Sequence, residues 1–397
     1  MAEDEGIITE ILAGTHALID LDAYTANIQA LRAAAPHAEL MAVVKADAYG
    51  HGAVYCGHAA LAAGCAWLGV ARISEGLLLR SNGISAPVLV LGPPNLAEIT
   101  RALDANLTLA VGSRSVLDAV LGVAAGRSSP ARVHIKVDTG MHRYGFEPHE
   151  VCDLFARLQS HADIAVDGVF THFARADERD LALTDRQVAV FSDVVASLEA
   201  AGLLPRWVHQ ANSAGILIGR TAGSNLVRSG IATYGLDPSD ELPAGPNFTP
   251  IMTVRAPVGR RFTLPRGEGV AYGWTYVAPE TEEDAVVAIG YADGLPRQLA
   301  NRGWFSANGE RAPIHGRVCM DQTIIGAPPG LAEGDLVTVF GPERGAMSLN
   351  DIAAIAGTNN YEIATRLMAR VPRIYLQGGT PVAWEQPLLG KRGYCRS

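Results

Sequence analysis

Several cationic or ionisable side chains stand where short apolar runs of this sequence end. The four most conspicuous are Lys45 in MAVVK, Lys136 in VHIKV, His172 after VDGVFT and Arg228 in LVRS. An amine backed by an apolar strand loses part of its hydration, which lowers its pKa and lets it attack a carbonyl carbon. Lys45 is therefore a candidate for Schiff-base chemistry, although solvated loop ends and caps would place such residues in similar positions.

Two further segments offer groups that bind anions. NSAG at 212–215 and SGI at 229–231 present backbone N–H groups at a helix start and in a loop, the arrangement that cradles phosphate. A Schiff-base lysine together with a phosphate cradle indicates pyridoxal 5'-phosphate as cofactor. Sugar-phosphate aldolase chemistry uses the same two features and stays open at this point.

The elements that must position these residues alternate regularly over the first 240 positions. Helix-like segments separate eight strand-like runs, and a further helix before the first run begins at Asp22, a candidate N-cap. The strand-like runs lie at 41–45, 67–71, 88–92, 108–111, 133–137, 166–171, 207–211 and 226–229. Nearly continuous apolar strands indicate a parallel sheet. Eight units predict a (β/α)₈ barrel, whose chemistry lies at the carboxyl ends of its strands. A doubly wound open sheet is the alternative, but no Gly-x-Gly-x-x-Gly turn follows the first run.

The helix-like segments of this half lie at 22–35, 52–64, 74–81, 114–125, 147–160 and 181–201. After residue 245 the pattern changes. PAGPNFTP at 243–250 is typical of a linker, and strand-like runs follow at 251–258, 285–290, 313–319 and 335–340, then helical patterns at 348–356 and 359–369. We therefore expect a barrel domain over residues 1–245, with its first residues free to pack against the second domain, and a mostly β domain over 246–397.

Composition excludes several classes of protein. The chain has 397 residues, of which 48% are hydrophobic and 18% charged, and its formal net charge is −9 with no basic run. This composition is that of a folded chain, and it argues against nucleic-acid binding. Residues 48–71 lack Asp, Glu, Lys and Arg but contain histidines and glycines, so we expect no membrane span. Five scattered cysteines and an acidic N-terminus without a signal-peptide pattern favour free thiols in the cytoplasm.

A series of motifs, taken in order, resembles one known family. They are AVVKADAYGHG, KVDTGMHRYG, THFA, ANSAG, VRSGIATYGLDP, AYGWTY, IGYADG, GRVCMDQ, GTNNYE and RVPRIY. One such motif is weak, but ten in sequence order over residues 15 to 377 are specific. The chain resembles alanine racemase, a pyridoxal-phosphate enzyme of fold type III. The resemblance implies a barrel that binds the cofactor and a homodimer with shared active sites.

The resemblance also implies a role for each matching residue. Lys45 would form the Schiff base with the cofactor and then exchange protons on the D face of Cα, and Tyr272 would act on the L face from the partner subunit. The cofactor would be held, beside Lys45, by Tyr49, His172, Ser213, Arg228, Gly230, Ile231 and Tyr361. Of these, Arg228 would contact the pyridine nitrogen, His172 would lie beside the ring, and the others would bind phosphate.

The substrate would contact residues from both domains. Arg143 and Met320 would bind the carboxylate, and Tyr291 would narrow the entrance together with Tyr361. Lys136 matches a lysine that many family members carry as a carbamate, although it could instead pair with Asp138 or Asp321. The resemblance implies no metal.

Racemisation explains why two different bases are needed. One proton leaves one face of Cα and another arrives on the opposite face, which a single side chain cannot easily serve. The function implied is the interconversion of L-alanine and D-alanine, with D-alanine supplied for peptidoglycan. Three alternatives remain: a broad-specificity or serine racemase on the same scaffold, a fold-type III decarboxylase, and a non-catalytic pyridoxal-phosphate carrier. AYGWTY argues against the decarboxylase, which needs no second proton-transfer residue, and the second domain argues against the carrier.

Overall fold

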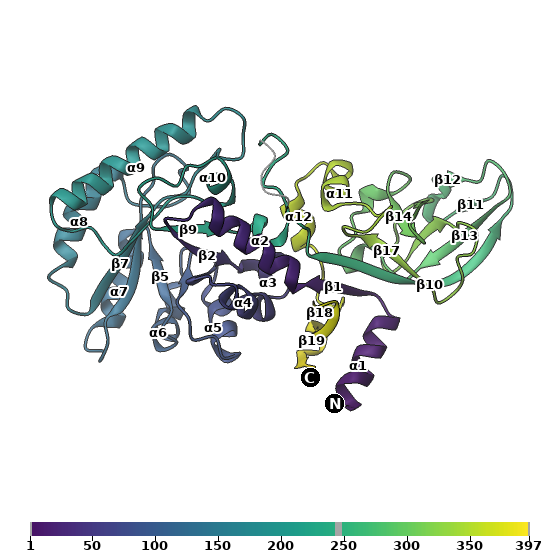
Figure 1. Cartoon of the computed structure of the whole chain (residues 1–397), viewed down its shortest axis with the longest axis horizontal. Helices are drawn as coiled ribbons and strands as arrows, with labels where there is room; N and C mark the ends of the chain where they lie inside the picture. The colour runs from purple at the N-terminus through teal and green to yellow at the C-terminus, as the bar shows by residue number, and fades with distance from the viewer. Residues whose placement is uncertain (1, 243–247, 396–397) are drawn as a thin grey trace. The chain divides into compact units, whose positions relative to one another are not determined.

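The computed structural model describes residues 2–242 and 248–395 and contains two compact units. One unit combines residues up to Tyr24, Tyr49–Tyr55 and the part from Thr249 onward; the other holds Thr25–Ala48 and the described residues from Cys56 to Phe248. Figure 1 colours the chain from its N-terminus to its C-terminus. The linker expected at 243–250 falls largely on residues 243–247, which lie outside the described residues.

The second of these units is built on eight parallel strands. They are β2 (Glu39–Val43), β3 (Trp67–Val70), β4 (Val88–Val90), β5 (Thr108–Val111), β6 (Ala131–Lys136), β7 (Ile164–Phe170), β8 (Trp207–His209) and β9 (Leu226–Ser229). From β2 to β8 each strand pairs in parallel with the next, and β9 pairs in parallel with β2. Between β8 and β9 the N–H groups of Asn225 and Arg228 donate to the carbonyls of Val208 and Ala211, both at 3.0 Å. The predicted barrel is confirmed, and the open-sheet alternative is wrong.

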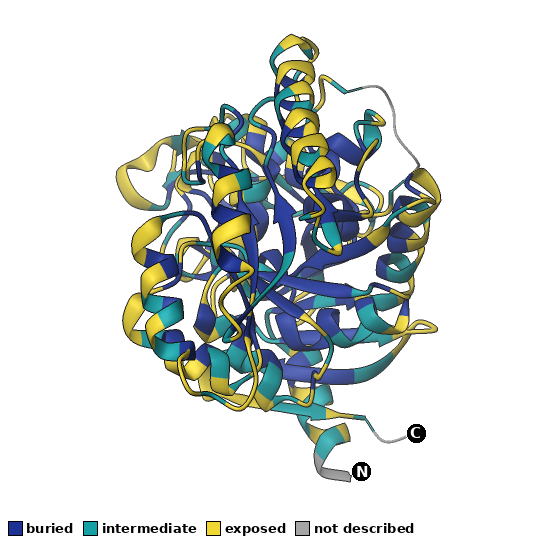
Figure 2. Cartoon of the chain, turned by 90° about the vertical axis from the view of Figure 1, so that its left-hand side faces the viewer, coloured by how far each residue is buried: buried dark blue, intermediate teal, exposed yellow. Residues whose placement is uncertain are grey.

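Helices surround these strands. They are α2 (Leu21–Ala34), α4 (Ala53–Ala62), α5 (Ile73–Ser81), α6 (Ile99–Asp104), α7 (Arg114–Ala124), α8 (Val151–Leu158), α9 (Ala182–Ala200) and α10 (Ser213–Leu217). In Figure 2 the strands are dark blue and the outer faces of the helices are yellow, as expected for amphipathic helices over a buried sheet. Met41, Trp67, Leu89, Ala110, Phe170 and Leu226 form one buried cluster. The predicted helices are confirmed to within a few residues, whereas α6 and α10 were too short to predict.

The expected N-cap of α2 is wrong by two residues. The side chain of Asp20, not Asp22, accepts from the N–H groups of Asp22 and Ala23, both at 2.9 Å. Asp22 instead accepts from the N–H of Gly378. An aspartate in the first turn of a helix can reach a donor from another segment, which the local sequence does not reveal.

The other unit is mostly β structure. Its main sheet follows the order β15-β14-β17-β10-β1-β18-β19-β20, with β13 pairing both β10 and β16. The strands are β1 (His16–Asp20), β10 (Met252–Leu264), β13 (Glu282–Val287), β14 (Trp304–Ala307), β15 (Glu310–Pro313), β16 (Thr323–Gly326), β17 (Leu336–Phe340), β18 (Arg373–Gln377), β19 (Thr380–Gln386) and β20 (Lys391–Tyr394). Strand β1 pairs antiparallel with β10 and parallel with β18.

Five expectations for this unit are confirmed and one is wrong. The strands at 251–258, 285–290 and 335–340 and the paired helices appear, the latter as α11 (Leu349–Ala356) and α12 (Asn360–Thr365). The strand expected at 313–319 is wrong, because β15 ends at Pro313 and the next residues form an irregular segment that leads to Met320. Among the described residues, no helix has the length and apolarity needed to cross a bilayer. All five cysteines are free thiols, as expected.

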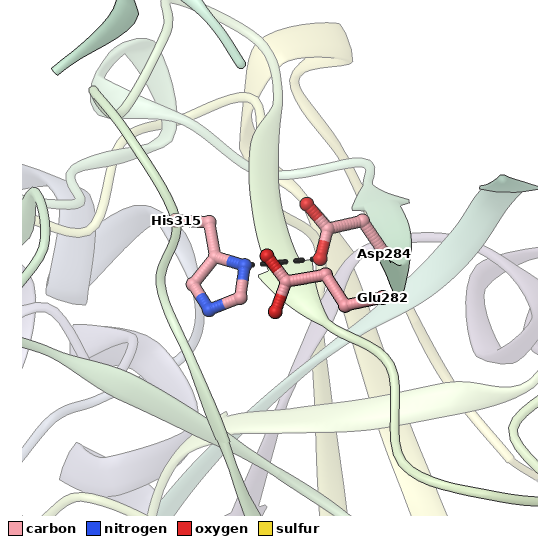
Figure 3. A group of neighbouring side chains, drawn as sticks. All are labelled: Glu282, Asp284 and His315. Atoms are coloured by element: carbon pink, nitrogen blue, oxygen red, sulfur yellow. Dashed lines mark hydrogen bonds and ion pairs between the residues drawn. The ribbon is translucent and has the colours of Figure 1, made fainter. Parts of the chain in front are cut away.

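A buried polar cluster lies on one face of β13. Glu282 and Asp284 are two residues apart, so both side chains point to the same face of the strand. Figure 3 shows them converging with His315, whose Nδ1 hydrogen-bonds to Asp284 Oδ1 at 2.9 Å. The imidazole stacks on Tyr276 at 3.8 Å between centroids, and the Tyr276 hydroxyl donates to Glu282 at 2.8 Å. Candidate ligand atoms of the three side chains also lie within 4.8 Å of one another, but these bonds already explain their arrangement. We therefore assign the cluster a structural role.

His315→Ala should destabilise the β-rich unit, because it leaves a fully buried carboxylate without its donor. We expect a loss of about 2–4 kcal/mol in the free energy of unfolding, measured by denaturant titration. His161→Ala, at an exposed position, is the control. Equal stability of the two variants would show that the hydrogen bond to Asp284 contributes nothing.

Candidate active site

The carboxyl ends of the barrel strands bring the predicted polar residues to one rim. Lys45 follows β2, Lys136 ends β6, His172 follows β7, Ser213 begins α10 after β8, and Arg228 lies in β9. His172 reports how close they are: burial lowers its pKa well below the ordinary value, and the positive charges of Arg228, Arg143, Lys136 and Lys45 lower it further. The rim is therefore a concentrated cluster of cations around a neutral imidazole.

Arg228 is the buried centre of this rim. Its Nη2 donates to the carbonyls of Thr171 and Gln210 at 2.9 and 3.1 Å and to Nδ1 of His172 at 3.0 Å. Its Nη1 donates to Nδ1 of His209 at 2.8 Å. Burial lowers the pKa of the guanidinium to about 10, so it stays charged at neutral pH. Within the described part of the chain its Nε–H makes no hydrogen bond and is available to a ligand.

Two histidines that the sequence did not single out extend this network into the barrel. Arginine has no acceptor, so Nδ1 of His209 must accept and its proton must sit on Nε2. That proton is donated to Nδ1 of His134 at 2.8 Å. Burial and the charge of Arg228 keep the pKa values of both imidazoles low, so both stay neutral. Only their place at inward-facing strand positions could have indicated this role.

Lys136 is buried and bonded to a backbone carbonyl. Its Nζ donates to the carbonyl of Tyr144 at 2.7 Å and lies 4.6 Å from the centroid of that ring. Burial lowers the pKa of the amine to about 8, with Arg143 and Arg228 acting in the same direction and Asp138 opposing. The Asp138 carboxylate accepts from the N–H groups of Gly140, Met141 and His142 in its own loop. The carboxylate is therefore hydrogen-bonded to its own loop, and it acts on Lys136 through the attraction between their charges.

Lys45 is half-buried at the start of an unusual turn. Burial and the charge of Arg143 lower the pKa of its amine, while Glu75 opposes them. The next four residues, Ala46, Asp47, Ala48 and Tyr49, have φ values of 52°, 53°, 52° and 54°. This left-handed conformation costs an L-residue about 1–2 kcal/mol each, so the turn is strained and has to be held in place.

The rest of the turn is anchored through glycine. Gly50 has φ of 84°, and a Cβ there would lie 2.3 Å from the carbonyl oxygen of Ala364. The Gly50 carbonyl accepts from Nε and Nη2 of Arg373, both at 3.2 Å. His51 Nδ1 hydrogen-bonds to the carbonyl of Tyr49 at 3.0 Å, which helps to hold the turn.

The predicted phosphate cradle assembles around Ser213. Its buried hydroxyl accepts from the N–H of Gly230 at 2.9 Å and lies 3.1 Å from the hydroxyl of Ser229. Asn212 caps α10 by accepting from the N–H of Gly215 at 2.9 Å. Ile231, also buried, opens a short 3₁₀ turn directly after Gly230. The structure thus brings Ser213, Gly230 and Ile231 together.

Arg143 belongs to the barrel unit, and the other remaining predicted residues belong to the β-rich unit. The rings of Tyr49 and Tyr361 lie 6.2 Å apart between centroids. Burial raises the pKa of Tyr49, which makes it a neutral hydrogen-bond donor at physiological pH. Three of these residues are more exposed: the predicted catalytic residue Tyr272 is 72% exposed, and the predicted substrate residues Met320 and Tyr291 are 52% and 39% exposed.

Two loops of this unit are tied together. Tyr291 N–H donates to the carbonyl of Cys319 and Ala292 N–H to that of Met320, both at 3.0 Å. Arg370, which sequence reasoning missed, forms ion pairs at 2.8 Å with both Asp293 and Asp321, one from each loop. Tyr291 and Met320 are therefore presented by one connected assembly.

The fold is that of a (β/α)₈ barrel enzyme. A lysine and a buried arginine lie at the carboxyl ends of its barrel strands, and the chain also has a β-rich unit. Comparison with known proteins identifies the family. Residues 19–238 match the family model described as alanine racemase, N-terminal domain, and residues 251–375 match alanine racemase, C-terminal domain. The chain belongs to the alanine racemase family, whose members are isomerases.

Individual relatives agree along almost the whole length. The alanine racemase of Salinispora tropica is 45% identical over 369 residues, covering 90% of this chain and 97% of that protein. Among solved structures, alanine racemase from Streptomyces lavendulae is 40% identical with a TM-score of 0.86, covering 92% of this chain and 97% of that one. Alanine racemase from Bacillus anthracis with bound L-Ala-P is 37% identical with a TM-score of 0.87, covering 95% and 98%.

Lys136 should give the protein a distinctive pH dependence. Its pKa is about 8 in the folded chain and 10.5 ordinarily, so between these values the unfolded chain binds more protons. The buried charge therefore opposes folding fully below pH 8, and this cost disappears as the pH rises toward 10.5. In buffer freed of carbon dioxide, the free energy of unfolding of the wild type should rise relative to Lys136→Met over this window.

Lys391→Met, at an exposed lysine, is the matched control and should keep the pH dependence of the wild type. A constant difference between wild type and Lys136→Met from pH 7 to 10.5 would contradict the lowered pKa.

Proposed function

We propose that this protein interconverts L-alanine and D-alanine with pyridoxal 5'-phosphate bound at the barrel rim. The observation that carries the proposal is the rim itself, where a half-buried lysine of lowered pKa lies near Arg143, and where both this lysine and the buried Arg228 act on His172. Family membership supports the reaction, and the bound L-Ala-P of the relative from Bacillus anthracis supports an alanine-sized substrate.

The donor groups present fit this cofactor. The cofactor offers an aldehyde, a phosphate and a pyridine nitrogen; Lys45 supplies an amine, Ser213 a hydroxyl beside Gly230 and Ile231, and Arg228 an unused Nε–H. We propose that Tyr49 and Tyr361 also hold the phosphate and that His172 lies beside the ring. When bound, the cofactor supplies the electron sink that makes the Cα proton acidic.

Arg228 would set the electronic character of that sink. Its bonds go to carbonyls and to neutral imidazoles, so no acid adjoins its guanidinium to protonate a neighbouring nitrogen. A guanidinium donates and cannot accept, so Arg228 would leave the pyridine nitrogen of a bound cofactor neutral. The cofactor would then supply a weaker electron sink, which would favour proton return to Cα over transamination.

Arg228→Glu should therefore raise side reactions. We expect at least about tenfold more conversion of the cofactor to its amine form per racemisation event, because a carboxylate would keep the ring protonated. The measurement is pyridoxamine phosphate formed during turnover, by chromatography. Arg228→Lys, which keeps a positive donor, is the control; accumulation no greater than in the wild type for Arg228→Glu would contradict the assignment.

Two side chains would move the protons. Lys45 would remove or return the proton on the D face, and its lowered pKa places more of the amine in the neutral, proton-accepting form. Tyr272 would serve the L face. Arg143 and Met320 would fix the substrate carboxylate, and Tyr291 with Tyr361 would leave room for little beyond a methyl side chain.

We propose that Tyr272 and Met320 complete the site of a second copy of the chain. Tyr272, Met320 and Trp274 are all more than half exposed, which is unusual for large apolar side chains in a monomer. Tyr272 and Met320 also line one surface pocket together with Cys319 and Gln322. Such a surface supports an isologous dimer interface.

Mixing two inactive variants tests both the reaction and the shared site. Lys45→Ala should lose the imine absorbance and all racemisation, whereas Tyr272→Phe should keep the cofactor and lose racemisation. In a heterodimer of the two, one site would combine a native Lys45 with a native Tyr272. Activity should then return to about a quarter of the wild type after full exchange of subunits.

If both residues acted within one chain, no mixture would recover activity. Activity on serine, lysine or arginine comparable to that on alanine would favour the broad-specificity alternative. Absence of alanine racemisation in the wild type would refute the proposed function.

Two finer points belong to the same proposal. We propose that Lys136 is carbamylated, since an amine with a pKa near 8 is partly neutral at physiological pH and can attack carbon dioxide, forming an N–C bond and losing a proton. We also propose that the enzyme works in the cytoplasm and supplies D-alanine for peptidoglycan. The five free cysteines are consistent with a reducing compartment.

A further inference from the structure

The strained turn after Lys45 has an anchor outside its own segment. Within the turn, the N–H of Ala48 donates to the carbonyl of Val44 at 2.9 Å. The N–H of Ala46, the residue directly after Lys45, donates to Oε1 of Glu75 at 2.7 Å. Glu75 lies on α5, after the following strand, so this bond links two consecutive βα connections of the barrel.

The second oxygen of Glu75 is bound just as firmly. Oε2 accepts from the N–H of Ala71 at 2.7 Å and from that of Arg72 at 3.0 Å, at the start of α5. The carboxylate is therefore held by three backbone donors, and its orientation toward Ala46 is set by α5. A charged acceptor makes a stronger bond to an N–H group than a neutral one.

We propose that Glu75 is a positioning residue for Lys45: its carboxylate holds the left-handed turn in place and so fixes where the lysine amine is presented. The inference rests on the proposed function for its catalytic consequence. A freely relaxing turn would move the amine, and a displacement of about 1 Å at a reacting group costs rate rather than affinity.

The charge of Glu75 has a separate effect. Lys45 lies among cations, with Arg143 lowering its pKa and Glu75 acting in the opposite direction. Removing the carboxylate should lower the pKa of the amine further. If Glu75 served only as a structural cap of α5, its removal would change neither the hydrogen exchange of the turn nor the labelling midpoint of the Lys45 amine.

Three substitutions separate these roles in the full-length protein. Glu75→Asp can still cap α5 but is too short to reach Ala46 as well; Glu75→Gln keeps an acceptor and loses the charge; Glu75→Ala loses both. Asp118→Asn removes an exposed acid from α7 in the same unit and is the control.

The chain offers an unusually clean chemical readout, because it contains only three lysines, Lys45, Lys136 and Lys391. The cofactor-free protein is labelled with acetic anhydride at a series of pH values, and the labelled peptides are measured by mass spectrometry. The pH midpoint of Lys45 acetylation reports the pKa of its amine, and the exposed Lys391 is the internal reference. Hydrogen exchange of the peptide that contains Ala46–Tyr49 reports the turn. Steady-state kcat and KM complete the set.

We expect exchange in this peptide to rise at least about tenfold in Glu75→Ala and Glu75→Asp, but less in Glu75→Gln. The Lys45 midpoint should move to lower pH in Glu75→Ala and Glu75→Gln and stay in place in Glu75→Asp and Asp118→Asn. In Glu75→Ala and Glu75→Asp, kcat should fall about tenfold or more with KM changed less than about threefold.

Wild-type exchange and an unmoved Lys45 midpoint in Glu75→Ala would overturn the proposal. If Glu75→Ala does not fold, the other two variants decide. Wild-type hydrogen exchange in Glu75→Asp together with an unmoved Lys45 midpoint in Glu75→Gln would then overturn the proposal. A wild type without racemase activity would refute the proposed function alone, since labelling and exchange need neither cofactor nor substrate.

Discussion

The crowding of positive charge at the barrel rim is the constraint on which the rest of this site depends. Four cationic side chains converge on His172, and burial makes their charges costly. Lys45 and Lys136 have lowered pKa values, which the proposed proton transfer and carbamylation would require. Arg228 keeps its charge by bonding to carbonyls and imidazoles. Among the described residues no carboxylate bonds to the guanidinium, so under the proposed function the same bonds would determine the kind of electron sink that a bound cofactor can be.

Holding such a cluster requires a rigid support, and the barrel supplies it in layers. Arg228 is bonded to His209, and His209 to His134, so the network runs from the rim into the buried interior. The strained turn after Lys45 is fixed by Glu75 from α5. In the β-rich unit, Arg370 joins the loops that carry Tyr291 and Met320. In each case a residue outside the predicted site holds the one that would touch substrate or cofactor.

The sequence alone predicted the eight strands, the barrel and the rim residues, since apolar strands and polar strand ends are local patterns. The sequence did not predict features that depend on contacts between residues far apart along the chain. Asp22 was expected to cap α2, but Asp20 does so because Gly378 engages Asp22. The strand expected at 313–319 ends at Pro313. His134, His209, Glu75 and Arg370 carry no motif of their own, and only their three-dimensional neighbours reveal their roles.

The sequence by itself determined the family, the order of the elements and the residue types available for chemistry, because motifs and apolar periodicity are properties of neighbouring residues. Only the tertiary structure decided which imidazole nitrogen bears a proton, how far burial lowers the pKa of Lys136, and that four residues after Lys45 adopt left-handed geometry. The physical reason is that burial and hydrogen bonding depend on partners tens or hundreds of positions away. Those partners meet only when the strands close into a barrel.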